Sequence, residues 1–166
     1  MAGDEQVSGE KPGPPPAPVR VLISDDDPIA RRFLESAVSR AGYEVTAVPG
    51  VDEAWQILSA LGDVPTVAIL DWMMPGLTGV ELCEKVRAAT PQVPLYLIVL
   101  TSRGETSDVV RALQAGADDR ITKPFEPAEL RARLAAGARI VTLQQQLADR
   151  SGRSRRRWRT CSSSRG

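Results

Sequence analysis

The 166-residue chain contains no histidine, and it has only two cysteines. The absence of histidine excludes a Ser-His-Asp triad, a histidine metal site and a phosphohistidine carrier. Cys83 lies in a helical pattern and Cys161 in a polar segment, so the pair gives neither a disulfide framework nor a zinc-binding spacing. The chemistry of this chain must therefore come from other side chains.

Long apolar runs are also missing. The longest ones, such as residues 95–100, are far too short to cross a bilayer. Acidic and proline residues stand near the N-terminus, where a signal peptide would have an apolar stretch. Hydrophobic residues still make up 42% of the chain, which is enough for the core of one domain. We expect a cytoplasmic protein without membrane contact.

The net charge of zero conceals an uneven distribution along the chain. Residues 1–18 are rich in proline and have no helical or strand period, which predicts a disordered tail. Residues 151–166 carry six arginines and no acid, and they too are expected to form a disordered, basic tail. Arginine outnumbers lysine eighteen to three, so a lysine is an unexpected choice wherever it occurs.

Between these tails, strand-like apolar runs alternate with amphipathic helical patterns. The expected strands are 19–24, 43–48, 67–70, 95–100 and 120–122. The expected helices are 28–41, 51–61, 79–89, 105–115 and 127–149. Alternation of this kind predicts an α/β fold with a parallel sheet covered by helices on both faces.

Polar side chains follow four of the expected strands at the point where each strand ends. Because right-handed crossovers bring the carboxyl ends of parallel strands to one edge, these residues should meet there. They are Asp25, Asp26 and Asp27 after the first strand, Asp71 after the third, Thr101 and Ser102 after the fourth, and Lys123 after the last. Asp27 precedes Pro28, and its pattern favours a helix cap.

Converging carboxylates repel one another unless a cation compensates, and Mg²⁺ suits such oxygen ligands because it leaves a position for a phosphoryl oxygen. Mn²⁺ is an alternative. Lys123 could then supply a positive charge and Thr101 a hydrogen bond to the same phosphoryl group. Asp71 is left as the nucleophile, which predicts an aspartyl phosphate.

Four segments resemble the receiver domains of two-component response regulators: "SDDDPIARR", "AILDWMMPGLTGVEL", "VLTSRGE" and "GADDRITKPF". The resemblance covers about residues 19–140. It implies a flavodoxin-like, doubly wound sheet of five strands in the order 2-1-3-4-5, and a phosphoryl group received from a sensor histidine kinase or a phosphotransfer protein. A helical extension would follow over residues 141–150.

The resemblance also implies individual roles. Asp25, Asp26, Asp71 and the backbone carbonyl of Met73 would bind the metal, with Asp71 as phosphoacceptor. Thr101 would be the switch hydroxyl, and Lys123 would bind the phosphoryl group next to a cis bond to Pro124. Arg120 stands where the family usually has tyrosine or phenylalanine, so the usual inward swing of an aromatic ring is not expected.

Other interpretations remain open at this stage. A phosphohydrolase with an aspartate nucleophile, similar to haloacid dehalogenases, would need a second aspartate where this chain has Met73. A degenerate receiver that only binds other proteins is the main alternative. Nucleic-acid binding would rest on the basic tail alone and is not expected. The chain could be a stand-alone regulator or a receiver without its output portion.

The last expected helix continues past the usual end of a receiver domain. Ile140, Leu143 and Leu147 recur at steps of three and four residues, which predicts an apolar stripe without a sheet beneath it. We expect a homodimer through this helix. A frayed extension that folds back on its own domain is the alternative, and Gly137 weakens the helix by roughly 1 kcal/mol relative to alanine.

Overall fold

The computed structural model describes residues 18–89, 93–102 and 106–161, with side chains up to residue 152. Strands and helices alternate along the chain, as the sequence pattern predicts. They are β1 (Arg20–Ser24), α1 (Pro28–Arg40), β2 (Glu44–Val48), α2 (Val51–Ser59), β3 (Thr66–Asp71), α3 (Gly79–Ala89), β4 (Leu95–Thr101), α4 (Thr106–Gln114), β5 (Asp119–Thr122) and α5 (Pro127–Cys161).

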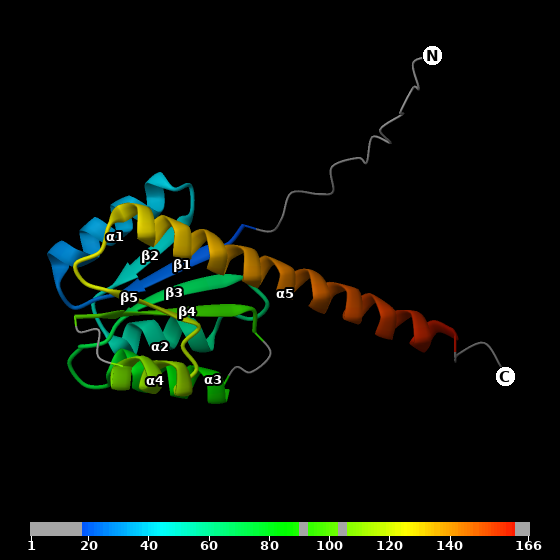
Figure 1. Ribbon diagram of the computed structural model, residues 1–166. Coiled ribbons are helices and arrows are strands. Elements are labelled where there is room, and N and C mark those ends of the chain that lie inside the picture. Colours follow the sequence, from blue (N-terminus) through cyan, green and yellow to red (C-terminus); the bar gives the residue numbers. More distant parts are fainter. Residues whose placement is uncertain (1–17, 90–92, 103–105, 162–166) are drawn as a thin grey trace, which may run out of the picture.

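The five strands form one parallel sheet in the order β2-β1-β3-β4-β5 (Figure 1). Helices α1 and α5 cover one face, and α2, α3 and α4 cover the other. Every residue of β3 and β4 is buried, because these central strands have helices on both faces. The predicted flavodoxin-like fold and its strand order are confirmed.

Helix α5 packs closely against the sheet at Gly137. A Cβ atom at this position would lie 2.5 Å from Cδ1 of Tyr96 on β4. Leu130, Leu134 and Val141 continue the same buried side of the helix. The glycine therefore has a packing role, which an estimate of helix propensity alone does not reveal.

Most element boundaries lie within one or two residues of those expected from the sequence, but the end of α5 differs. This helix continues to Cys161, whereas the sequence pattern predicted its end at 149 and a disordered tail from 151. Loss of the apolar pattern does not itself end a helix, and arginine is a good helix former. Residues 1–17 and 162–166 of the predicted tails lie outside the described residues.

Candidate functional site

Three carboxylates meet at the carboxyl edge of the sheet. Asp25 directly follows β1 and is completely buried, Asp26 is exposed, and Asp71 ends β3 with 8% of its surface accessible. One oxygen atom from each lies within 4.8 Å of the others. The topology thus produces the acidic cluster that the sequence predicts. It is the only group of three or more potential metal-ligating side chains within the described part of the chain.

Asp27 does not belong to this cluster. Its carboxylate accepts a hydrogen bond of 3.0 Å from the Ile29 backbone N–H and caps α1. Its own backbone N–H donates to Oδ1 of Asp25 at 2.9 Å, which fixes the loop after β1. The guanidinium group of Arg31 donates to the backbone carbonyl of Asp25 at 2.8 Å and secures the same loop from α1.

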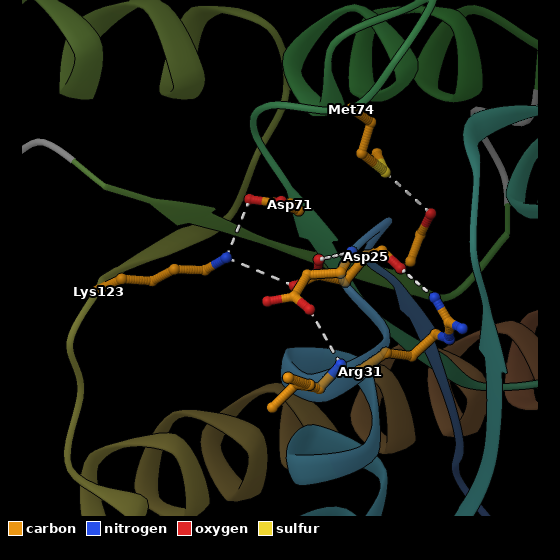
Figure 2. A network of polar contacts seen from close by, with 8 residues as sticks. Asp25, Arg31, Asp71, Met74 and Lys123 are labelled. Atoms are coloured by element: carbon orange, nitrogen blue, oxygen red, sulfur yellow. Dashed lines mark hydrogen bonds and ion pairs between the residues drawn. The ribbon is translucent and has the colours of Figure 1, made fainter.

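Lys123 brings one cation to the acidic cluster (Figure 2). Its Nζ atom lies 3.3 Å from Oδ1 of Asp71 and 3.4 Å from Oδ2 of Asp25. The backbone N–H of Lys123 donates to the Thr101 carbonyl at 2.7 Å, and the bond from Lys123 to Pro124 is cis, as expected from the resemblance. The end of β5 is therefore held beside the ends of β4 and β3.

The electrostatics of the cluster show an imbalance of charge. Burial raises the pKa of Asp71, and repulsion from Asp25 and Asp26 adds to this effect, while Lys123 opposes it. Burial lowers the pKa of Lys123, but attraction to Asp71 and Asp25 outweighs burial and leaves the pKa raised. Three carboxylates thus share one ammonium group, and a hard divalent cation with oxygen ligands would relieve the excess negative charge. The donor set fits Mg²⁺.

Thr101, the last residue of β4, is buried beside the cluster. It pairs in register with Thr122 of β5, immediately before Lys123. A hollow of about 370 Å³ opens next to Asp71, and it is lined by Trp72, Met73, Thr101, Ser102 and Asp108. The hollow adjoins the end of β3 through Trp72 and Met73, and its lining is more apolar than polar.

The turn after β3 requires a glycine at position 79. A Cβ atom there would overlap the backbone carbonyl oxygen of Asp71, and the Gly79 N–H donates to the Trp72 carbonyl at 3.0 Å. Thr78 and Glu81 form a capping box at the start of α3, with reciprocal hydrogen bonds of 2.7 and 3.2 Å. These contacts fix the direction in which Asp71 leaves the strand.

Met73 and Met74, adjacent in this turn, have opposite surroundings. Met73 is 67% exposed and lines the hollow, whereas Met74 is buried, with its sulfur 3.1 Å from the Ser24 hydroxyl (Figure 2). Sequence reasoning identified Met73 and missed the contact between Met74 and Ser24. It also missed the close approach that requires a glycine at position 79. No signal in the sequence indicated either contact. Metal ligation by the Met73 carbonyl remains a prediction.

Arg120 lies on β5 with its backbone N–H bonded to its neighbour Asp119 at 2.8 Å. Its guanidinium group donates to the Thr122 hydroxyl over 3.5 Å, the upper limit for a hydrogen bond. Asp119 in turn binds Arg133 of α5 at 2.9 Å through both carboxylate oxygens. Arg120 therefore contacts Thr122, the neighbour of Lys123, on one side and Asp119, which forms the ion pair to α5, on the other. A role of Arg120 in switching remains a prediction.

A comparison with models of known protein families identifies the family of this chain. Residues 21–135 match the response regulator receiver domain. The chain belongs to the receiver domain family of response regulators. Receiver domains are parts of two-component signalling proteins and are not turnover enzymes, which decides against the phosphohydrolase interpretation.

Relatives of this receiver include longer regulators. It is 38% identical over 116 residues to the phosphate regulon transcriptional regulatory protein PhoB of Pseudomonas aeruginosa, covering 70% of this chain and 50% of that protein. It is 44% identical over 116 residues to the transcriptional regulatory protein CseB of Streptomyces coelicolor, covering 70% and 47%. The chain thus spans about half the length of these curated relatives.

Solved receiver structures have the same fold. A putative response regulator from Chloroflexus aurantiacus is similar with a TM-score of 0.65 and 37% identity, over 73% of this chain and 98% of that one. A CheY-like receiver domain protein from Methanospirillum hungatei has a TM-score of 0.66 at 26% identity, over 78% and 98%. Within the described residues, no helix is long and apolar enough to span a membrane.

Proposed function

We propose that Asp71 accepts a phosphoryl group from a phosphorylated histidine of a sensor kinase or phosphotransfer protein, in a Mg²⁺-dependent reaction in the cytoplasm. One observation carries the proposal: the Lys123 ammonium group lies between Asp71 and Asp25, beside a cluster of three carboxylates. This arrangement supports the roles proposed here: Asp71 as the nucleophile, the three carboxylates as the metal-binding set and Lys123 as the phosphate-binding cation.

The reaction forms one bond and breaks another. An Oδ atom of Asp71 attacks phosphorus, the P–N bond to the donor imidazole breaks, and its electron pair stays on the departing nitrogen. Bound Mg²⁺ would be held by Asp25, Asp26 and Asp71, with the Met73 carbonyl as a further ligand, and would neutralise charge on the phosphoryl oxygens. Lys123 binds one of these oxygens, and the Thr101 hydroxyl donates to another.

A surface beside the site suits a protein donor. Helix α1 begins after Asp27, and it exposes Ile29 by 79% and Phe33 by 49%. The Phe33 ring packs against Phe125, with ring centroids 6.2 Å apart, close to the Lys123-Pro124 bond. A donor that delivers phosphohistidine to Asp71 would cover this apolar surface.

The proposal is tested by mass spectrometry of the intact chain after incubation with Mg²⁺ and acetyl phosphate. The expected result is one added phosphoryl group that is labile to hydroxylamine and absent in Asp71→Asn. Asp27→Asn is the matched control, because it removes a carboxylate from the neighbouring loop while asparagine can still cap α1. A phosphoryl group that persists in Asp71→Asn would show that the site is wrong.

The alternative is a degenerate receiver that only binds other proteins. It predicts no mass increase with acetyl phosphate or with a phosphorylated histidine donor, even when Mg²⁺ is saturating. An Ile29→Ser variant separates the docking of a protein donor from the phosphoryl transfer itself. We expect it to lose transfer from a protein donor and to retain transfer from acetyl phosphate, whereas Leu113→Ser on exposed α4 should retain both.

A further inference from the structure

The part of α5 that continues past the sheet has an apolar stripe on its surface. Ile140, Leu143 and Leu147 are 40%, 52% and 63% exposed, and we call these three residues the α5 seam. They follow one another at steps of three and four residues, so they lie on one side of the helix. Figure 1 shows this half of α5 extending away from the sheet.

The seam is not a continuation of the buried side of α5. Leu134, Ala138 and Val141 face the sheet and are buried. A helix turns by about 100° per residue, which places the seam roughly 120–130° around the helix from Val141. The seam therefore lies on a different side of the helix from the residues that pack on the sheet. In proteins most helical stability comes from the packing of an apolar face, so an exposed apolar stripe favours a partner.

The order of residues in the seam fits a second copy of the same helix. In heptad positions, Ile140 is a, Leu143 is d and Leu147 is the next a. Isoleucine at a with leucine at d favours parallel two-stranded pairing. The seam would then face its own copy across a two-fold axis, with Leu143 opposite Leu143.

The residues at the e and g positions beside the seam are compatible with this symmetry. In a parallel pair, each g position faces the e position five residues later in the other helix. Here Arg139 would face Gln144, and Gln146 would face Ser151, so no like charges meet at the e and g positions. The next d position after Leu147 is Arg150, which would face its own copy, so the seam ends at Leu147. An amide both donates and accepts hydrogen bonds, which makes the two glutamines suitable partners for an arginine and a serine of the other helix.

We propose that a second copy of this chain packs its α5 in parallel against the α5 seam and forms a two-fold symmetric dimer. Leu143 also borders a hollow with Val19 and Tyr43, at the amino ends of β1 and β2. The seam thus lies at the edge of the sheet opposite Asp71, and the dimer does not rest on the proposed phosphoryl transfer. Because the seam covers fewer than two heptads, the dimer forms at high protein concentration.

Charge substitutions at one position test both the surface and its symmetry. Leu143→Glu and Leu143→Lys each place like charges opposite each other in the dimer, so each variant alone should sediment as a monomer. An equimolar mixture of the two variants should recover dimer, because glutamate then faces lysine. Ala148→Glu adds the same charge on the same helix away from the seam and should dimerise like the parent chain.

Sedimentation equilibrium of the full chain over a wide range of concentrations provides the measurement, with circular dichroism to confirm that each variant is folded. The parent chain should show a monomer–dimer equilibrium. Monomers at every concentration, an unaffected Leu143→Glu dimer, or no recovery in the mixture would each overturn the proposal. Phosphorylation of Asp71 is measured separately on the same samples, so a failure of one proposal leaves the other distinguishable.

Discussion

The ammonium group of Lys123 lies 3.3 Å from the carboxylate of Asp71, with a second carboxylate, that of Asp25, 3.4 Å away. Both acids come from strands that are adjacent to each other in the sheet, and the lysine comes from the strand at its edge. The lysine therefore forms ion pairs with two of the three carboxylates of the cluster. Its loss should affect the metal and the phosphoryl group in opposite ways.

We predict that Lys123→Ala slows phosphorylation of Asp71 by about 10²–10³-fold, because a charge aimed at the reacting group is lost. Its Mg²⁺ affinity should stay equal or rise, since the competing ammonium is gone. Calorimetric titration measures the Mg²⁺ affinity, and mass spectrometry at successive times measures the rate of phosphorylation. Lys85→Ala, which removes a lysine that lies over Trp55, is the control. Equal losses in both measurements would contradict this division of roles.

The pKa of Asp71 predicts how metal-free stability depends on pH. The pKa is raised from its ordinary value of 3.8, first by burial and then by Asp25, against the attraction of Lys123. The folded chain therefore binds this proton more tightly than the unfolded chain. The stabilisation is fully present below pH 3.8 and is lost as the pH rises through the folded pKa.

At neutral pH in chelator, Asp71→Asn should consequently melt higher than the parent chain, and the difference should vanish below pH 3.8. For a chain of this size, 1 kcal/mol corresponds to roughly 2–4 °C in Tm. Mg²⁺ should raise the Tm of the parent chain more than that of the variant, because one ligand is missing. A variant that melts lower in chelator would show that the attraction to Lys123 exceeds the cost of burial.

The packing of α5 gives a prediction about stability alone. Gly137→Ala adds a methyl group 2.5 Å from the buried ring of Tyr96. The gain in helix propensity is about 1 kcal/mol, whereas overpacking costs about 1–3 kcal/mol, so we expect a lower free energy of unfolding. Gly152→Ala has open space around it and should be neutral or stabilising. Urea denaturation compares the two, and a stabilised Gly137→Ala would contradict the close approach.

The sequence predicted the acidic cluster because topology alone brings it together. Once the strands are parallel, Asp25, Asp71 and Lys123 must lie at one edge, and their residue types then indicate the chemistry. The ends of the elements are harder to predict from sequence, since α5 continues beyond the point where its apolar pattern stops. The apolar period shows which side of a helix is buried, but it does not show at which residue the helix ends.

Contacts that depend on the distance between two elements could not be predicted in the same way. The overlap that makes Gly79 necessary and the contact between Gly137 and Tyr96 arise only when backbones approach closely. The bond from Ser24 to the Met74 sulfur joins residues far apart in the sequence. Each involves a glycine or a serine, and neither residue type shows in the sequence alone which distant residue it contacts.

Arg120 provides the last prediction. Its guanidinium group contacts Thr122, and its backbone contacts Asp119, which binds Arg133 of α5. Within the described part of the chain, Arg120 forms no hydrogen bond or ion pair with Asp25, Asp26 or Asp71. We therefore expect Arg120→Ala to accept the phosphoryl group on Asp71 at a rate close to that of the parent chain. An effect on switching should instead appear in β5 and α5, because these elements share the Asp119 ion pair.

Hydrogen exchange of the parent chain and of Arg120→Ala, each with and without phosphorylation, measures this effect. Phosphorylation should change the protection of β5 and the first turns of α5 in the parent chain, and less so in the variant. Arg120→Tyr introduces the aromatic side chain that the receiver family usually has at this position. This variant should again show a change in the protection of β5 and α5 on phosphorylation. Loss of phosphorylation in Arg120→Ala would instead place the arginine in the reacting site, and identical exchange in all three proteins would remove it from the switch.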